Sequence, residues 1–334
     1  MKIALTNSES AALKSVWQKA THSRSDIARL LQLSRPTASL LVKNLISGNF
    51  LSEDGNRRSS GGKPAIQLKI NPDCFHSIGI DIGYESAVRA LLLDAGGNII
   101  DRASVPASSC YADRVQAVCK AVETLRTSAT CGIGIAVSGT VDPQENRIIH
   151  SANFDLNDKP LAQEISSAVG LPVFVDNRAR MAARAEMFAG SGVSDFLLVS
   201  LGKGIGSAFS FSGKLYYGVS GRAGELRNII VPDYSGNGFF TFERALSDDM
   251  LEQQDYPCRK MAEICAAGFR QVLNFVDVSV VILAGRFALF PETFREELQK
   301  LLPEYDLRLS QFGRDSGACG SAVAAAEYAV FSKP

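Results

Sequence analysis

Four polar side chains between residues 35 and 43 have the types and the spacing of a helix that reads DNA. Arg35, Thr37, Ser39 and Lys43 fall on the outward side of an expected helix. Arginine and hydroxyl side chains early in such a helix can bond to base edges, and a later lysine can meet a phosphate. The pattern predicts a helix that enters the major groove by its N-terminal end.

A cationic loop follows this helix. It contains Arg57, Arg58 and Lys63 and runs from Asp54 to Pro64. Two short strands are expected on either side, at 50–53 and 65–70. A loop of this composition can contact phosphates or reach into the minor groove, as the wing of a winged helix does.

The elements that must position these residues are three short helices. The first covers 11–20. In the second, Ser23 is the expected N-cap, and Ile27, Leu30 and Leu31 point inward. A turn follows at 32–33, and Ser34 is the expected N-cap of the third helix, which ends at Gly48. The inward residues of this helix are Ala38, Leu41, Val42 and Leu45. This is a winged helix-turn-helix. A protein-interaction module of the same shape stays open as an alternative, although cap, turn, polar face and wing together favour DNA.

The charge distribution agrees with a separate DNA-binding domain. The whole chain has 35 basic and 35 acidic residues. Residues 1–70 hold eleven Lys and Arg against four Asp and Glu, a net charge of +7, and the other 264 residues hold 24 against 31, a net charge of −7. A small basic segment joined to an acidic body is typical of a nucleic-acid-binding module on a second domain. We expect this domain over 1–72 and the body over 73–334.

The body has the pattern of a two-lobed α/β domain. Strands are expected at 77–81, 87–93, 99–105 and 131–137, with a helix at 112–128 before the last of them. A related order of strand, glycine turn and strand returns at 196–214. A strand at 279–283 and a helix of small residues at 319–330 follow. Two related lobes with a ligand cleft between them explain this repetition, because glycine turns at strand ends are where open α/β sheets bind ligands.

Composition excludes several classes of protein. The 334 residues are 46% hydrophobic and 21% charged, which excludes a disordered chain. No apolar run approaches the roughly 20 residues that cross a bilayer, and the N-terminus has no signal-peptide pattern. We therefore expect a cytoplasmic protein without a membrane partner. The seven cysteines form no CxxC pair, so neither disulfides nor a thiolate zinc site are expected.

Seven segments of the chain, in this order, resemble the ROK family of repressors, open-reading-frame proteins and sugar kinases. They are LSRPTASLLVKNLI at 33–46, GGKPAIQLKINP at 61–72, IGIDIG at 78–83, GIGIAVSGTVD at 132–142, VDNRARMAARAE at 175–186, LGKGIG at 201–206 and GVSGRAGELRN at 218–228. The resemblance implies a sugar-kinase-like, actin-like fold for the body. A winged helix in front of it resembles the repressor branch of the family.

The chain departs from the family's kinases where their chemistry takes place. In those kinases the segment at 175–178 resembles V-E-N-D, whose last Asp takes the proton from the sugar hydroxyl. Here Arg178 stands at that place, and an arginine, with a pKa above about 12, is no base near neutral pH. Asp176 lies two residues before the position that the family's base would occupy, so it does not match that base. We therefore predict no catalytic residue and no enzymatic activity.

The cofactor sites of the family are also altered. The first nucleotide loop resembles D-I-G-G-T in the family, but here Tyr84 and Glu85 follow Gly83, and Lys203 changes the second loop. The zinc motif G-H with C-x-C-G-x-x-G-C is replaced by Arg227-Asn228 and a segment at 233–241 without cysteine. Zinc requires Cys or His ligands, so we expect no metal and no cofactor.

Five positions match sugar-contacting positions or the loop beside the sugar in the family. By this resemblance they are Gly139, Asn153, Asn177, Glu225 and Glu243. Carboxylates and amides suit a sugar because its hydroxyls need several convergent donors and acceptors. The same residues could instead cap helices and turns, and that alternative stays open.

These features together predict a cytoplasmic, DNA-binding transcription regulator of carbohydrate metabolism. A sugar or sugar derivative in the cleft would be its effector. The resemblance favours a repressor that forms a homodimer or tetramer, because a dimer presents two winged helices to a palindromic operator. Two alternatives remain: an ATP-dependent sugar kinase with an appended DNA-binding domain, and a constitutive DNA-binding protein whose body serves only for dimerisation.

Overall fold

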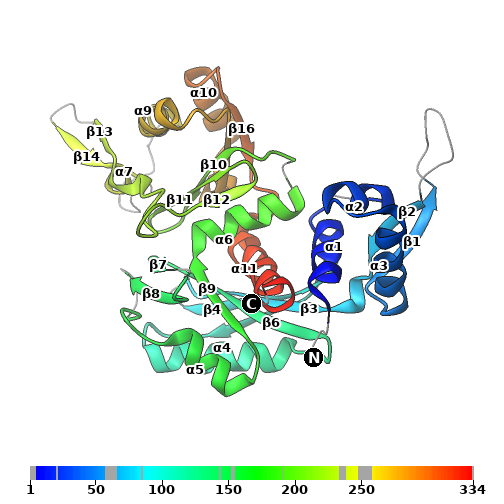
Figure 1. The fold of residues 1–334 in the computed structure, drawn as a ribbon. Coiled ribbons are helices and arrows are strands. Elements are labelled where there is room, and N and C mark those ends of the chain that lie inside the picture. The colour runs from blue at the N-terminus through cyan, green and yellow to red at the C-terminus, as the bar shows by residue number, and fades with distance from the viewer. Residues whose placement is uncertain are drawn as a thin grey trace. The chain divides into compact units, whose positions relative to one another are not determined.

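A computed structural model describes residues 5–19, 22–56, 66–83, 86–142, 144–151, 155–190, 192–232, 238–246 and 258–332 (Figure 1). The chain divides into two compact units, each of which is described by itself. Unit 1 comprises Met1–Ile135, Pro160–Phe174 and Ser321–Pro334, and unit 2 comprises Ala136–Lys159 and Val175–Gly320. Among the described helices, none combines the length and the apolar composition that a membrane crossing requires.

Three capped helices and a hairpin begin unit 1. Helix α1 (Asn7–Trp17) starts at a capping box, in which Thr6 Oγ1 accepts the Glu9 N–H at 3.2 Å and Glu9 accepts the Thr6 N–H at 3.0 Å. Ser23 and Ser34 cap α2 (Arg24–Leu30) and α3 (Arg35–Ser47), as the sequence predicts. Strands β1 (Leu51–Asn56) and β2 (Ile66–Ile70) then pair antiparallel. The described part of the predicted winged helix-turn-helix thus has the expected order of elements.

Apolar residues from all five elements close the core of this predicted winged-helix domain. Its buried members are Ala12, Leu13, Val16, Ile27, Ala28, Ala38, Val42, Leu45, Leu51 and Leu68. One inward prediction is wrong, because Leu30 is 53% exposed. Helix α2 ends at Leu30 and Gln32 has a φ of +53°, so the chain turns there and Leu31 packs on the core instead. Leu41 is only half-buried.

The body part of unit 1 is built on a five-stranded sheet of order β5-β4-β3-β6-β9. Its strands are β3 (His76–Asp81), β4 (Ala87–Asp94), β5 (Ile99–Pro106), β6 (Thr130–Val137) and β9 (Val173–Asn177). Every residue of β6 is buried, which explains its continuous apolar sequence. Helix α4 (Tyr111–Leu125) packs on β4 and β5 and against α5 (Leu161–Val169). A short turn η1 (Pro72–Cys74) joins the winged-helix domain to β3.

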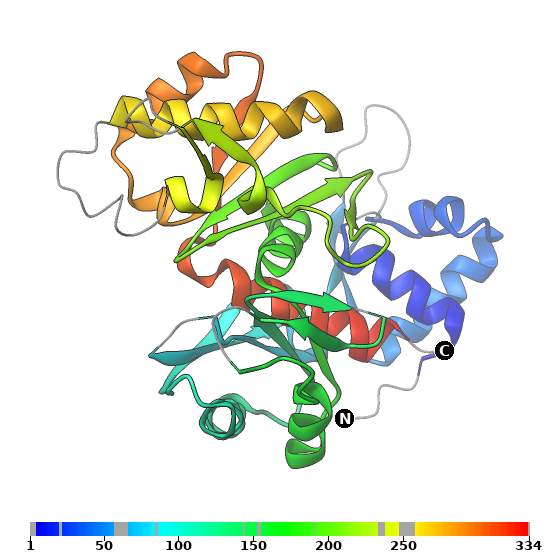
Figure 2. The same cartoon turned by 90° about the vertical axis from the view of Figure 1, so that its left-hand side faces the viewer.

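The last helix of the chain is α11 (Ser316–Ala326), and turn η6 (Glu327–Phe331) continues it. All residues of α11 are buried. Its small side chains let it approach other backbones closely, since a Cβ on Gly134 of β6 would lie 1.9 Å from the Ser321 carbonyl oxygen. The end of η6 reaches helix α1 (Figures 1 and 2).

Unit 2 contains a second five-stranded sheet, of order β12-β11-β10-β15-β16. Its strands are β10 (Phe196–Leu201), β11 (Ile205–Phe211), β12 (Lys214–Tyr216), β15 (Val280–Gly285) and β16 (Asp306–Leu309). Strands β10 and β11 are antiparallel, whereas β10, β15 and β16 are parallel to one another. The sheet is therefore mixed, as the sequence predicts for the body.

Helices cover this second sheet. They are α6 (Arg178–Ala185) with the π-turn η2 (Glu186–Gly190), α7 (Phe242–Ala245), α9 (Cys258–Val276), η4 (Arg286–Leu289) and α10 (Glu292–Leu301). A phenylalanine cluster packs between α7, α9, η4 and α10, with Phe269 and Phe287 fully buried. The remaining elements of unit 2 are β7 (Thr140–Asp142), β8 (Arg147–His150), η3 (Leu226–Asn228), β13 (Ile230–Pro232), β14 (Phe239–Thr241) and η5 (Gly313–Asp315).

Candidate functional site

Helix α3 presents a polar face to solvent. Arg35, Thr37, Ser39 and Lys43 are all exposed, whereas Ala38, Val42 and Leu45 of the same helix are buried. Ser34 Oγ accepts the Thr37 N–H at 3.2 Å and lies 2.7 Å from Thr37 Oγ1, so the first turn is held in place before any ligand binds. The predicted wing residues Arg57, Arg58 and Lys63 lie outside the described residues.

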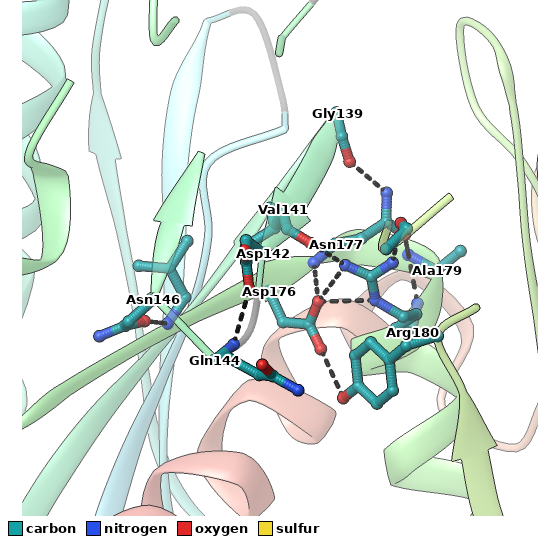
Figure 3. A network of polar contacts seen from close by, with 12 residues as sticks. Gly139, Val141, Asp142, Gln144, Asn146, Asp176, Asn177, Ala179 and Arg180 are labelled. Atoms are coloured by element: carbon teal, nitrogen blue, oxygen red, sulfur yellow. Dashed lines mark hydrogen bonds and ion pairs between the residues drawn. The ribbon is translucent and has the colours of Figure 1, made fainter. Parts of the chain in front are cut away.

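A buried polar network lies at the beginning of α6 (Figure 3). Asp176 Oδ1 accepts from Arg180 Nε at 2.7 Å and from Nη2 at 2.6 Å, and Tyr217 donates its hydroxyl to Oδ2 at 3.0 Å. The side chains of Asp176 and Arg180 are 0% and 4% exposed. Arg180 also donates to the carbonyls of Gly221 and Val141, each at 2.9 Å. Several segments of unit 2 therefore meet at one carboxylate–guanidinium pair.

Tyr217 takes part in the network as a neutral donor. Burial, followed by the negative charge of Asp176, raises the pKa of Tyr217 to about 12. The guanidinium of Arg180 stacks 4.8 Å from the centre of its ring, and Arg184 donates to its hydroxyl oxygen at 2.7 Å. Asp176 has both oxygens occupied by these donors and no access to solvent. The carboxylate therefore serves to join Arg180 and Tyr217 inside unit 2.

Asn177 and Gly139 lie in contact with each other. Asn177 Nδ2 donates to the Gly139 carbonyl at 2.6 Å, while Asn177 Oδ1 caps α6 by accepting the N–H groups of Ala179 and Arg180. Gly139 has a φ of +146°, and a Cβ there would lie 2.1 Å from the His150 carbonyl oxygen. Only glycine fits this turn. The side chain of Asn177 keeps one amide hydrogen for a further acceptor.

Arg178 and Glu243 both lie against the glycine turn between β10 and β11. A Cβ on Gly202 would lie 3.4 Å from Arg178 Nη1, and one on Gly204 would lie 2.1 Å from Glu243 Oε1. Glu243 also accepts the Ile205 N–H at 3.3 Å. A cation and a carboxylate therefore border the turn. These two side chains offer hydrogen-bond donors and acceptors beside the turn.

The other predicted effector residues are placed differently. Glu225 is the N-cap of η3, is half-buried and pairs with Arg227 Nε at 2.8 Å. Arg227 and Asn228 form η3 itself, where the family has part of its zinc motif. Asn153 lies outside the described residues, as do Tyr84 and Glu85 of the first glycine turn. Within the described residues there is no group of three or more His, Cys, Asp or Glu that could hold a metal ion.

The sequence interpretation missed the roles of Arg180, Tyr217 and Arg184. Spacing gave a usable signal for one contact, because Asp176 comes just before the N-cap of α6 and Arg180 lies four residues later, in its first turn. Nothing in the sequence pattern links them to Tyr217, Gly221 or Val141. Those contacts arise only when β7, the loop after β12 and α6 fold together.

The sequence pattern of the ROK family matches residues 77–239. The chain is 32% identical over 345 residues to a protein of Caldicellulosiruptor sp. (strain Rt8B.4) named "Putative xylose repressor", with 87% of this chain and 86% of the relative covered. Among solved structures, a ROK family glucokinase from Streptomyces griseus in complex with glucose and AMPPNP is 25% identical, with a TM-score of 0.65. The match covers 75% of this chain and 99% of the glucokinase.

A ROK family transcriptional regulator, described as a homolog of the E. coli MLC protein, is also similar in structure. Its TM-score is 0.74, and the match covers 97% of this chain and 96% of that one. The sequence identity is 19%, so this similarity concerns the fold alone. The fold similarity includes the N-terminal part of the chain, since only 3% of the chain falls outside it. Together with the repressor-named relative, these matches place the chain in the ROK family.

Proposed function

We propose that this protein is a sugar-responsive, DNA-binding transcription repressor that controls carbohydrate metabolism in the cytoplasm. The observation that carries the proposal is helix α3. Its buried residues complete the core of the N-terminal helices and hairpin, and Arg35, Thr37, Ser39 and Lys43 are exposed to solvent. A capped helix with this exposed face can enter a major groove without rearrangement. The repressor-named relative, which matches over most of its length, supports the same function.

The body acts as a sensor and not as a kinase. Arg178 occupies the place of the family's base, and it stays protonated near neutral pH. The neighbouring Asp176 is buried and bonded to Arg180 and Tyr217. For Asp176 to replace the missing base, it would have to give up hydrogen bonds from Arg180, Tyr217 and the Asn177 N–H and take up a proton without solvent contact. These two observations support the proposal that the body does not transfer a phosphoryl group to a sugar.

The effector is a sugar or sugar derivative that contacts the α6 side of unit 2. Gly139, Asn177 and Glu243 lie on segments that meet the N-terminus of α6 or the adjoining glycine turn. Asn177 and Glu243 offer amide and carboxylate groups, and Arg178 adds a donor. The effector regulates only if it binds two states of the protein with different affinities. Asn153 and Glu225 remain further proposed contacts.

Selection of genomic DNA fragments by the purified full-length chain tests the DNA half of the proposal. We expect enrichment of a short palindrome, because a homodimer would present two copies of α3 to one duplex. Gel-shift titration on the enriched fragment, with D-xylose first and then other pentoses, hexoses and sugar phosphates, tests the effector half. Absence of any preferred duplex would overturn the first half, and unchanged affinity and melting temperature with every sugar would overturn the second.

An ATP-dependent sugar kinase with an appended DNA-binding domain is the rival function, and the similarity to the Streptomyces griseus glucokinase favours it. A coupled ADP-release assay with the same sugar panel decides between the two. We expect no turnover above background. Sustained, sugar-dependent ADP release by the wild-type chain would establish the rival and reject the sensor.

A further inference from the structure

Helix α11 makes a backbone contact with α6 inside unit 2. A Cβ on Gly320 would lie 1.5 Å from the carbonyl oxygen of Met181, so the two helices touch with no side chain between them. Met181 follows Arg180, and the N-cap and first residue of the same helix are Asn177 and Arg178. Because a direct backbone contact has no flexible side chain to absorb movement, a displacement of α6 must be passed on to α11.

The following residues of α11 belong to unit 1, where the helix is held just as closely. Ser321 contacts Gly134 of β6, as described above, and the helix is buried along its whole length. Its eleven residues contain no proline that would break the helix and no charged side chain that would draw it toward solvent. The helix continues through η6 to Phe331.

The C-terminal end of η6 packs against helix α1 of the predicted winged-helix domain. The ring centre of Phe331 lies 5.0 Å from that of Trp17 on α1 and 6.1 Å from that of Phe75, which follows the linker turn η1. Trp17 and Phe75 are 4% and 1% exposed. Gln18 also donates to Glu327 at 3.3 Å. We call these three rings, Trp17, Phe75 and Phe331, the aromatic clamp.

We propose that α11 and η6 transmit the state of α6 to the DNA-binding domain through the aromatic clamp. The proposal rests on the proposed function, since it names the path by which the effector side regulates the DNA side. A shift of α6 that accompanies sugar binding moves Gly320, and α11 moves with it as a stiff body. Phe331 then changes its packing on Trp17, which reorients α1 under helix α3. Phe331, Trp17 and Gly320 are positioning residues in this path.

Trp17 provides a direct readout, because it is the single tryptophan of the chain. Gly320→Ala inserts a methyl group against the Met181 carbonyl and must separate α6 from α11. We expect the acrylamide quenching constant of Trp17 to rise by about twofold, because looser packing of Phe331 lets the quencher reach the indole ring more often. The matched control is Gly268→Ala in α9, where a Cβ would press on the Phe242 ring at 3.1 Å in the same unit. The control variant should have the same Trp17 quenching constant as the wild type.

A folded Gly320→Ala protein with wild-type Trp17 quenching would overturn the proposal, and so would an equal change in the Gly268→Ala control. If circular dichroism shows that Gly320→Ala does not fold, the path is tested from its other end. Phe331→Ala should speed amide exchange in residues 178–185 of α6, whereas Phe275→Ala, at an 89% exposed site on α9, should not. Unchanged exchange in α6 would reject the coupling.

These measurements need neither the operator nor the effector, so they separate the two proposals. If the wild-type chain selects no DNA, the proposed function fails while Trp17 still reports whether the path exists. If DNA is selected but Trp17 does not respond to Gly320→Ala, the function stands and the path is wrong.

Discussion

Asp176 and Arg180 form a buried ion pair one helical turn apart, with Nη2 of Arg180 2.6 Å from Oδ1 of Asp176. The pair ties α6 to β7, because Arg180 Nη2 donates to the Val141 carbonyl at 2.9 Å. Asp176 also accepts the backbone N–H of Asn177 at 2.6 Å, so the pair helps to position the residue that caps α6.

Replacing Asp176 by Ala should therefore destabilise the protein strongly. The change leaves the guanidinium of Arg180 buried without its counter-charge, which typically costs about 3–5 kcal/mol. Denaturant unfolding of the wild type and the variant measures the difference. The control is Arg227→Ala, which breaks the half-buried pair with Glu225 and should cost no more than about 1 kcal/mol. Similar costs for the two variants would contradict the structural role of Asp176.

Glu186 should make stability depend on pH in the opposite direction from most carboxylates. It is 2% exposed, and burial raises its pKa, although Ser310 and Gln311 donate to it. A carboxyl whose folded pKa is raised stabilises the fold below its unfolded pKa, and this contribution is lost as pH rises through the folded pKa. Glu186→Gln removes the titration, so its stability relative to the wild type should increase from pH 4 to pH 8.

Urea unfolding of both proteins at several pH values in this range measures the effect. Glu297→Gln is a suitable control, because Lys300 lowers the pKa of that exposed carboxyl and the sign of its contribution is reversed. A constant difference between wild type and Glu186→Gln at all pH values would show that Glu186 does not titrate in this window.

The local parts of the structure could be predicted from the sequence. Ser23 and Ser34 cap their helices because a cap needs only the residues of the next turn, and the continuous apolar sequence of β6 follows from burial on both faces. The prediction for Leu30 is wrong because its environment depends on the turn at Gln32 and not on the helical period.

The candidate site could be predicted only in part. Asn177 contacts Gly139 and caps α6, which is the helix-capping alternative that the sequence left open, while its contact with a sugar stays a prediction. The partners of Arg180 come from β7 and from the loop around Gly221, some 40 residues away in each direction, and no local pattern encodes them. The aromatic clamp brings Trp17 to Phe331 across nearly the whole chain and has no sequence signal either.

Gly139→Ala should weaken both stability and effector binding. A Cβ at this position meets the His150 carbonyl and disfavours the φ of +146°, so the turn must shift and the hydrogen bond from Asn177 must lengthen. We expect a loss of about 1–3 kcal/mol in unfolding free energy, the usual cost of strain at such positions. Calorimetry with the sugar found by titration should show weaker binding than in Gly238→Ala, where a Cβ has open space. Equal binding by the two variants would separate Gly139 from the effector site.

The exposed cations of α3 should divide into one that reads bases and one that binds phosphate. Lys43→Ala should weaken binding to all duplexes and reduce the slope of the salt dependence by about one unit, because one phosphate is no longer neutralised. Arg35→Ala should instead change base preference, by about 1–3 kcal/mol at one position if the side chain bonds to a guanine. Competition gel shifts with the selected palindrome and its single-base variants, at several salt concentrations, distinguish the two effects. Arg295→Ala on α10, a cation remote from α3 in the sequence and in unit 2, should change neither quantity. If Arg35→Ala lowers affinity equally for every sequence, Arg35 binds phosphate and the bases are read by other residues of the helix.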